Sequence, residues 1–161
     1  MRIGWGLDVH RFGGNPPVLL AGIPADLDRG LLGTSDGDVV AHAVGDALLG
    51  AASLGDLGGL FPSSDPRWQG ADSMELLRIV VDRFHAKGLR VAHLDVTVVA
   101  ESVRLAPMRV AVRTALADAL DIEVDAVSVK ATTTDGLGFL GRDEGVAATA
   151  VVTASGPDTP N

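Results

Sequence analysis

Three side chains near the start of the chain are of types that bind divalent metal ions. Asp8 and His10 are two residues apart on an expected strand, so their side chains point to the same side. His42 lies on an expected helix, where Asp38 and Asp46, one turn to either side, could orient its second ring nitrogen. Any one of these residues alone is more often an ordinary packed or surface side chain. Together, one aspartate and two histidines leave a fourth zinc position open, which is typical of a catalytic site.

Two glycine-containing loops carry groups that suit phosphate. The segment GTSDGD, residues 33–38, joins a glycine turn to an expected helix N-terminus, where free N–H groups and the helix dipole favour a phosphate. The alternative is simple capping, in which Ser35 and Asp36 satisfy the helix N–H groups. The segment ATTTDGLGFLGRDEG, residues 131–145, places three threonines, an acid and Arg142 around glycines. It could hold a diphosphate and a second metal, or it could be a polar loop between strands.

The composition narrows the kinds of site and partner. A chain of 161 residues that is 47% hydrophobic can bury the core of one domain. Because there are no cysteines, histidine and carboxylate must hold any metal. The net charge of −8, without a basic cluster, makes nucleic acid an unexpected partner, so metal ions, backbone N–H groups and one or two cations must neutralise a phosphate ester. No long apolar run is present, so we expect a soluble cytoplasmic protein without membrane contact.

The elements that must position these residues are a mixture of strands and helices. Strands are expected at 2–9, 18–20, 90–100, 126–132 and 145–153. The last two strands are joined by a loop of hairpin type. This mixture predicts an α+β fold with a single mixed sheet, helices packed on one face and the other face available as a subunit interface. Residues 1–154 are expected to form one domain and residues 155–161 a disordered tail.

Capping residues mark where the expected helices begin. The helices are expected at 39–52, 73–87 and 107–121. Ser35, Asp36 and Asp38 stand at the N-cap and first-turn positions of the first helix. Asp72 and Glu75 form the pattern of a capping box for the second helix.

Three long blocks, in order, resemble the 2-C-methyl-D-erythritol 2,4-cyclodiphosphate synthase family from Gly4 to about Thr153. GWGLDVHRF is similar to the family's opening G-x-G-x-D-x-H-x-F. GTSDGDVVAHAVGDALLGAASLGDLGGLFPSSDP looks like its signature helix region. ATTTDGLGFLGRDEGVA is similar to its closing A-T-T-T-E-K-L-G-F-T-G-R-G-E-G.

The resemblance implies a metal-assisted phosphorus–oxygen lyase of the non-mevalonate isoprenoid pathway. Zn²⁺ would be held by Asp8, His10 and His42, and Mg²⁺ or Mn²⁺ by Asp135 together with the substrate diphosphate. The 2-phosphate of 4-diphosphocytidyl-2-C-methyl-D-erythritol 2-phosphate would attack the β-phosphorus. This intramolecular attack releases CMP and forms the cyclic diphosphate, and it asks the protein mainly for positioning and charge neutralisation.

The resemblance also implies substrate contacts and an assembly. The ribose would contact Asp56 and Gly58, and the cytosine would be read largely through backbone groups of AESVRLA, residues 100–106. The other implied substrate-binding residues are Asp8, His10, Thr34, Ser35, Phe61, Asp65, Ala100, Arg104, Leu105, Ala106, Thr132, Thr133, Asp135, Phe139 and Arg142. Thr34 and Thr133 are the implied catalytic positions. The family is a homotrimer with active sites between neighbouring subunits.

The chain departs from the family pattern at several of these positions. Thr34 stands in place of a histidine beside the phosphates, and its hydroxyl can donate one hydrogen bond. Asp135 replaces a glutamate and Gly136 a lysine. Ser63 replaces an acid, and Val103 and Arg104 replace Pro-Lys. Two alternatives therefore stand beside the synthase: a zinc-dependent phosphoester hydrolase, and a non-catalytic trimer that binds a nucleotide or an isoprenoid diphosphate.

Overall fold

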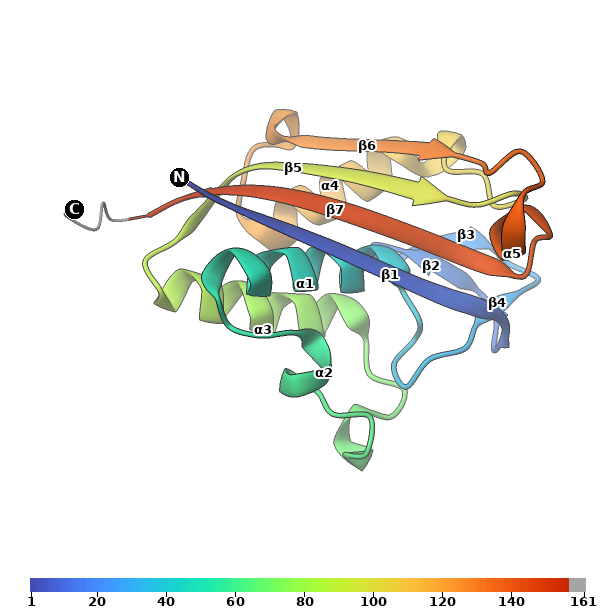
Figure 1. Cartoon of the computed structure of the whole chain (residues 1–161), viewed down its shortest axis with the longest axis horizontal. Helices are drawn as coiled ribbons and strands as arrows, with labels where there is room; N and C mark the ends of the chain where they lie inside the picture. Colours follow the sequence, from blue (N-terminus) through green and yellow to red (C-terminus); the bar gives the residue numbers. More distant parts are fainter. Residues whose placement is uncertain (157–161) are drawn as a thin grey trace.

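The computed structural model describes residues 1–156 as one sheet with helices against it (Figure 1). The strands are β1 (Arg2–Gly14), β2 (Val18–Leu20), β3 (Ile23–Asp26), β4 (Gly30–Leu31), β5 (Arg90–Val99), β6 (Val127–Thr132) and β7 (Gly145–Ser155). The α-helices are α1 (Val39–Ala52), α2 (Leu57–Leu60), α3 (Ser73–Ala86), α4 (Arg109–Leu120) and α5 (Gly138–Gly141). Single 3₁₀ turns are formed by Pro66–Trp68, Ala106–Met108 and Val124–Ala126. None of the described helices combines the length and the hydropathy needed to cross a membrane.

The main sheet has five strands in the order β4-β1-β7-β5-β6, with β5 and β6 parallel and the other pairs antiparallel. The α+β class and the mixed sheet are thus confirmed. Two details of the sequence prediction are wrong. The described residues hold a second, two-stranded sheet of β2 and β3, and β5 lies between β6 and β7, so those two strands do not form a hairpin. The parallel pairing of β5 and β6 requires a crossover, which α4 supplies.

Helices cover one face of this sheet. α1 lies along β1 and β7, α4 lies against β6, and α3 packs on α1 and α4 (Figure 1). Two glycines allow α1 to lie so close to β1. A Cβ on Gly4 would stand 1.8 Å from the carbonyl oxygen of Ala47, and one on Gly6 would stand 2.0 Å from that of Ala43. The even-numbered side chains of β1 that follow therefore point toward α1.

The odd-numbered side chains of β1 point away from the helices and are exposed. Ile3, Trp5, Leu7 and Val9 have exposed fractions of 41–64%, and Val151 on the neighbouring β7 is exposed as well. Single exposed apolar residues are common, but this row is contiguous on two paired strands. The sheet is thus packed on one face, and its other face is apolar along β1 and at Val151 of β7.

Two expected boundaries need correction. Asp38 alone is the N-cap of α1, and its carboxylate accepts the backbone N–H groups of Val40 and Ala41. Asp72 caps α3 as expected. Strand β7 runs through Ser155, so the chain is still ordered at the residue where the tail was expected to begin. The remainder of that expected tail, residues 157–161, lies outside the described residues.

Candidate active site

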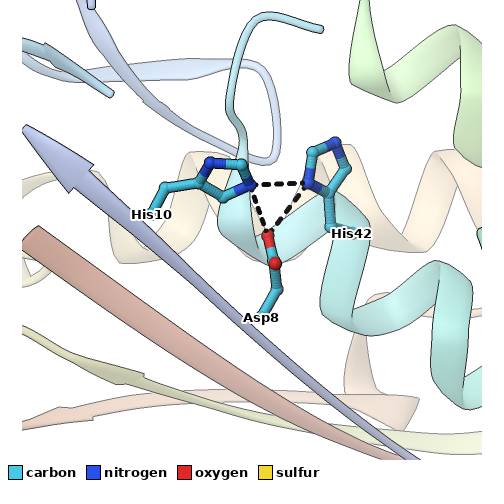
Figure 2. A group of neighbouring side chains, drawn as sticks. All are labelled: Asp8, His10 and His42. Atoms are coloured by element: carbon cyan, nitrogen blue, oxygen red, sulfur yellow. Dashed lines mark hydrogen bonds and ion pairs between the residues drawn. The ribbon is translucent and has the colours of Figure 1, made fainter. Parts of the chain in front are cut away.

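One ligand atom from each of Asp8, His10 and His42 converges on a common point (Figure 2). Asp8 Oδ2 lies 3.0 Å from His10 Nε2 and 2.9 Å from His42 Nδ1, and the two nitrogens are 3.3 Å apart. Tetrahedral zinc with bonds of about 2.0–2.1 Å separates its ligand atoms by roughly 3.3 Å. The donor set and its spacing therefore fit a divalent metal, as the sequence predicted.

Neighbouring groups decide which nitrogen each histidine presents. The Nδ1 atom of His10 lies in hydrogen-bonding contact with the carbonyl oxygen of Leu32, so Nδ1 carries the proton and Nε2 is free for a metal. The Nε2 atom of His42 lies 2.9 Å from both Ser35 Oγ and Ser73 Oγ, which leaves its Nδ1 free. The two histidines thus offer opposite nitrogens to the same point.

A carboxylate stands behind His42. Ser73 is buried, and its hydroxyl donates to Asp36 Oδ1 while its backbone N–H donates to Asp36 Oδ2 at 3.1 Å. Because that hydroxyl gives its proton to Asp36, its lone pairs face the Nε2–H of His42. Asp36, Ser73 and His42 therefore form a hydrogen-bonded chain that ends at the metal position.

The sequence assigned this orienting role to Asp38 and Asp46, and that prediction is wrong. Asp38 is fully buried and accepts backbone N–H groups from Ala21, Gly22 and the first turn of α1. Asp46 accepts the N–H of Leu57 at 2.8 Å. Because Asp38 accepts the N–H groups of Val40 and Ala41, the first turn of α1 is capped within the chain, as the capping alternative expects, although by Asp38 rather than by Ser35 and Asp36.

The metal position is charged and partly shielded from water. Burial raises the pKa of Asp8, but hydrogen bonds and charge from His10 and His42 outweigh it and hold the pKa well below its usual 3.8. The hydrogen bond to Asp8 raises the pKa of His10 above 6.5, against the opposite effect of burial. Without a metal the group is therefore an ion pair between Asp8 and a readily protonated His10.

A cavity of about 260 Å³ opens beside these three residues. The other residues lining it are Thr34, Ser35, Asp46, Leu57, Gly58, Phe61, Trp68 and Leu76. Thr34, Ser35, Gly58 and Phe61, which the family resemblance implies as substrate contacts, all line this cavity. Trp68 is not among the predicted site residues, although its ring packs edge-on against Phe61 with centroids 4.9 Å apart. The sequence feature that could have identified Trp68 is an aromatic residue seven positions after Phe61.

The remaining expected substrate residues do not line this cavity. Apart from Asp56 and Asp65, they lie at or after the carboxyl ends of β5 and β6, where the N–H of Ala100 donates to the carbonyl of Thr132 at 3.1 Å. Ala100 and Leu105 are buried, so only their backbone can reach a ligand, whereas Arg104 is exposed. The residues at this end are Ala100, Arg104, Leu105, Ala106, Thr132, Thr133, Asp135, Phe139 and Arg142.

Four of the predicted positions are occupied by local contacts. Asp56 caps α2 by accepting the N–H of Gly59, and Asp56 lies outside the metal cavity. Asp65 forms an ion pair with Arg67. The hydroxyl of Thr133 donates to the Asp135 carboxylate at 3.2 Å and accepts its N–H at 3.1 Å. None of these contacts excludes a ligand, because Asp56 and Asp135 are exposed and Asp65 and Thr133 are only half-buried.

The chain is similar to known proteins in both its sequence and its fold. The sequence model of the YgbB family matches residues 1–155. The 2-C-methyl-D-erythritol 2,4-cyclodiphosphate synthase of Proteus mirabilis is 51% identical over 94% of this chain and 95% of its own. The bifunctional IspDF of Campylobacter jejuni superposes with a TM-score of 0.94 at 43% identity, over 98% of this chain and 42% of that longer one. A CDP-bound structure of the synthase superposes with a TM-score of 0.87 at 35% identity, over 96% of this chain and all of the other. The chain therefore belongs to the YgbB family, the 2-C-methyl-D-erythritol 2,4-cyclodiphosphate synthase family that its motifs resemble.

Proposed function

We propose that this protein is a cyclodiphosphate synthase. It converts 4-diphosphocytidyl-2-C-methyl-D-erythritol 2-phosphate to 2-C-methyl-D-erythritol 2,4-cyclodiphosphate and CMP, as a phosphorus–oxygen lyase of the cytoplasm. The observation that carries the proposal is the convergence of Asp8, His10 and His42 in a chain 51% identical to a synthase over 94% of its length. We assign the whole activity to one domain, residues 1–155, the range that the family model matches.

The residues of the cavity suit an intramolecular phosphoryl transfer. The charge of the substrate diphosphate would be met by Zn²⁺ held by Asp8, His10 and His42 and by Mg²⁺ or Mn²⁺ held by Asp135. Thr34 and Ser35 line the cavity beside the zinc ligands, and their hydroxyls can donate hydrogen bonds to phosphate oxygens. The protein thus binds and orients the substrate so that its 2-phosphate reaches the β-phosphorus, and no covalent intermediate is needed.

We propose further that the working form is a homotrimer with shared active sites. Two observations support it. In one chain the predicted base and diphosphate residues lie outside the cavity of the metal ligands, so a neighbouring subunit can complete the site. The apolar side chains of β1 and β7 also need cover, and a second sheet can supply it. Light scattering should give three times the chain mass, and a monomer with full activity would refute the shared site.

Turnover of the purified protein tests the proposed reaction. With substrate, Zn²⁺ and Mg²⁺, phosphorus NMR should show equal amounts of CMP and the cyclic diphosphate. Release of inorganic phosphate or a linear product would instead indicate a zinc-dependent hydrolase. Binding of CMP without turnover would indicate a non-catalytic binding protein. The spectrum separates the first two outcomes, and unchanged substrate together with calorimetric binding of added CMP identifies the third.

A further inference from the structure

Arg29 joins three segments that are far apart in the sequence. Its Nη1 donates to Asp143 Oδ2 at 2.9 Å and its Nη2 to Ser102 Oγ at 2.6 Å. Its Nε donates to Asp26 Oδ2 at 2.7 Å, and its Cζ lies 4.0 Å from the centroid of the Phe12 ring. The guanidinium is therefore held along both its edges and over its face. A lysine could not make this set of contacts, because its ammonium is a single point charge.

Arg29, Ser102 and Asp143 form a closed ring of hydrogen bonds. The Ser102 hydroxyl accepts from Arg29 and donates to Asp143 Oδ1 at 2.7 Å. Since arginine only donates and carboxylate only accepts, the direction of every bond in the ring is fixed. Ser102 lies in the segment 100–106 that follows β5, and Asp143 lies in the loop that joins β6 to β7. The ring thus ties the two loops to each other and to the turn between β3 and β4.

The backbone conformation of Asp143 makes the presence of a side chain at this position notable. Asp143 has a φ of 58°, in the left-handed region that favours glycine. The family motif quoted above, G-R-G-E-G, has glycine at this position, where no side chain can form the ring. A non-glycine residue is strained in this conformation, and aspartate is among the few that tolerate it by local hydrogen bonding. In this chain the carboxylate has two partners from distant segments.

We propose that Arg29, Ser102 and Asp143 form a clamp that holds two loops in one fixed arrangement: the base-reading loop, residues 100–106, and the phosphate-binding loop, residues 133–144. The proposal rests on the proposed function, in which a cytidine nucleotide spans these loops. The clamp residues are positioning residues and need not touch the substrate. Because the loops are already ordered, the nucleotide does not have to order them on binding, which removes a cost of about 0.5–1.5 kcal/mol per immobilised side chain. This corresponds to roughly 2- to 10-fold in affinity.

Asp143→Gly is the sharpest test, because glycine relieves the left-handed strain while removing the ring. The partners are about one-third exposed, so the ion pair itself adds little to stability, and the melting temperature should change by no more than a few degrees. We expect the dissociation constant for CMP, measured by calorimetry on the metal-loaded protein, to rise 2- to 10-fold. KM should rise by the same factor with kcat nearly unchanged, since the clamp acts on binding.

Matched variants separate the clamp from general damage. Arg29→Lys should weaken CMP binding like Asp143→Gly, and the double variant should be no worse than either single one. Asp143→Asn keeps an acceptor for Ser102 and should recover part of the affinity. Hydrogen exchange of residues 100–106 and 133–144 should quicken together in Asp143→Gly, with zinc content unchanged.

The proposal is overturned if Asp143→Gly and Arg29→Lys bind CMP as tightly as the unaltered protein, or if their effects simply add. An unaltered protein that binds no CMP at all would overturn the proposed function, and the clamp with it. These two failures are distinguishable, because the first leaves CMP binding and turnover intact.

Discussion

The metal ligands Asp8, His10 and His42 project from the long strand β1 and the long helix α1, which form the metal end of the molecule. The expected base-reading and phosphate-binding loops follow β5 and β6 and form the loop end. At the metal end, close packing of α1 on β1 through Gly4 and Gly6 fixes the ligand positions. At the loop end, the buried side chains of Ala100, Val103 and Leu105 anchor the segment after β5 in the core, and side-chain hydrogen bonds join that segment to the loop before β7. A site on helices and strands is positioned by the packing of those elements, whereas a site on loops needs contacts between the loops to hold its residues in place.

Removal of one metal ligand should have the largest effect. His42→Ala leaves Asp8 and His10, and two ligands rarely hold zinc where three are needed. Loss of a single supporting partner costs 10- to 100-fold in metal affinity, so loss of a ligand itself should exceed about 100-fold. Zinc content and turnover should fall together. Mass spectrometric metal analysis and the CMP assay measure both.

His85→Ala is the matched control for that variant. His85 lies on α3 away from the metal cavity, so its removal should leave zinc and turnover unchanged. Full zinc occupancy in His42→Ala would remove His42 from the site and with it the contrast between the two ends of the molecule.

The metal end could be predicted from sequence because regular geometry decides it. Asp8 and His10 share a face because strand side chains alternate, and His42 faces them because α1 packs on the glycines of β1. The hydrogen bonds that orient His42 could not be predicted. Ser73 reaches His42 only through the packing of α3 on α1, and no local pattern encodes that contact.

The loop end was less predictable for the same reason. The residues of the family motifs identified the loops, but the bonds that hold them join positions 73 and 114 residues apart. The hairpin expected between β6 and β7 failed because β5 inserts between them, which is a choice of tertiary pairing. Strand and helix spacing therefore indicated the ligands and the family motifs indicated the loops, but neither indicated the hydrogen bonds between Arg29, Ser102 and Asp143.

Thr34→His should raise kcat by about 100-fold or less. A protonated imidazole can donate a charge-assisted hydrogen bond to the developing phosphate charge, whereas a threonine hydroxyl donates only a neutral one. One such donor is commonly worth 10²–10³ in rate, and metal ions already meet much of the charge here. The comparison is made at saturating substrate and metal. Thr34→Val, of similar shape without the hydroxyl, should be slower than the unaltered protein, and a histidine variant no faster would strike Thr34 from the catalytic residues.

Ser73→Ala should weaken metal binding by about 10- to 100-fold without removing a ligand. Its hydroxyl carries the link from Asp36 to the Nε2–H of His42. Ser35→Ala is the matched variant, because Ser35 contacts the same nitrogen but has no bond to Asp36. The Ser35 variant should therefore lose less affinity in a Co²⁺ titration followed by its visible spectrum. Equal losses would show that Asp36 does not orient His42.

The smallest expected effect is the pH dependence of metal binding, because protons compete with the metal for His10 of the Asp8–His10 ion pair. The hydrogen bond to Asp8 raises the pKa of His10 above 6.5, so protons compete with metal for Nε2 at a higher pH than at an ordinary histidine. Metal affinity should then fall about tenfold per pH unit below that raised pKa. The metal-free protein should follow the opposite trend, since a raised histidine pKa adds stability that is present below pH 6.5 and is lost as pH rises through the folded-state value. Melting temperatures with a chelator and with excess Zn²⁺ should therefore diverge between pH 6 and pH 8. His10→Gln removes both the titrating group and a metal ligand, so the gap should nearly close at every pH. A constant gap in the unaltered protein would rule out the Asp8–His10 ion pair as the competitor.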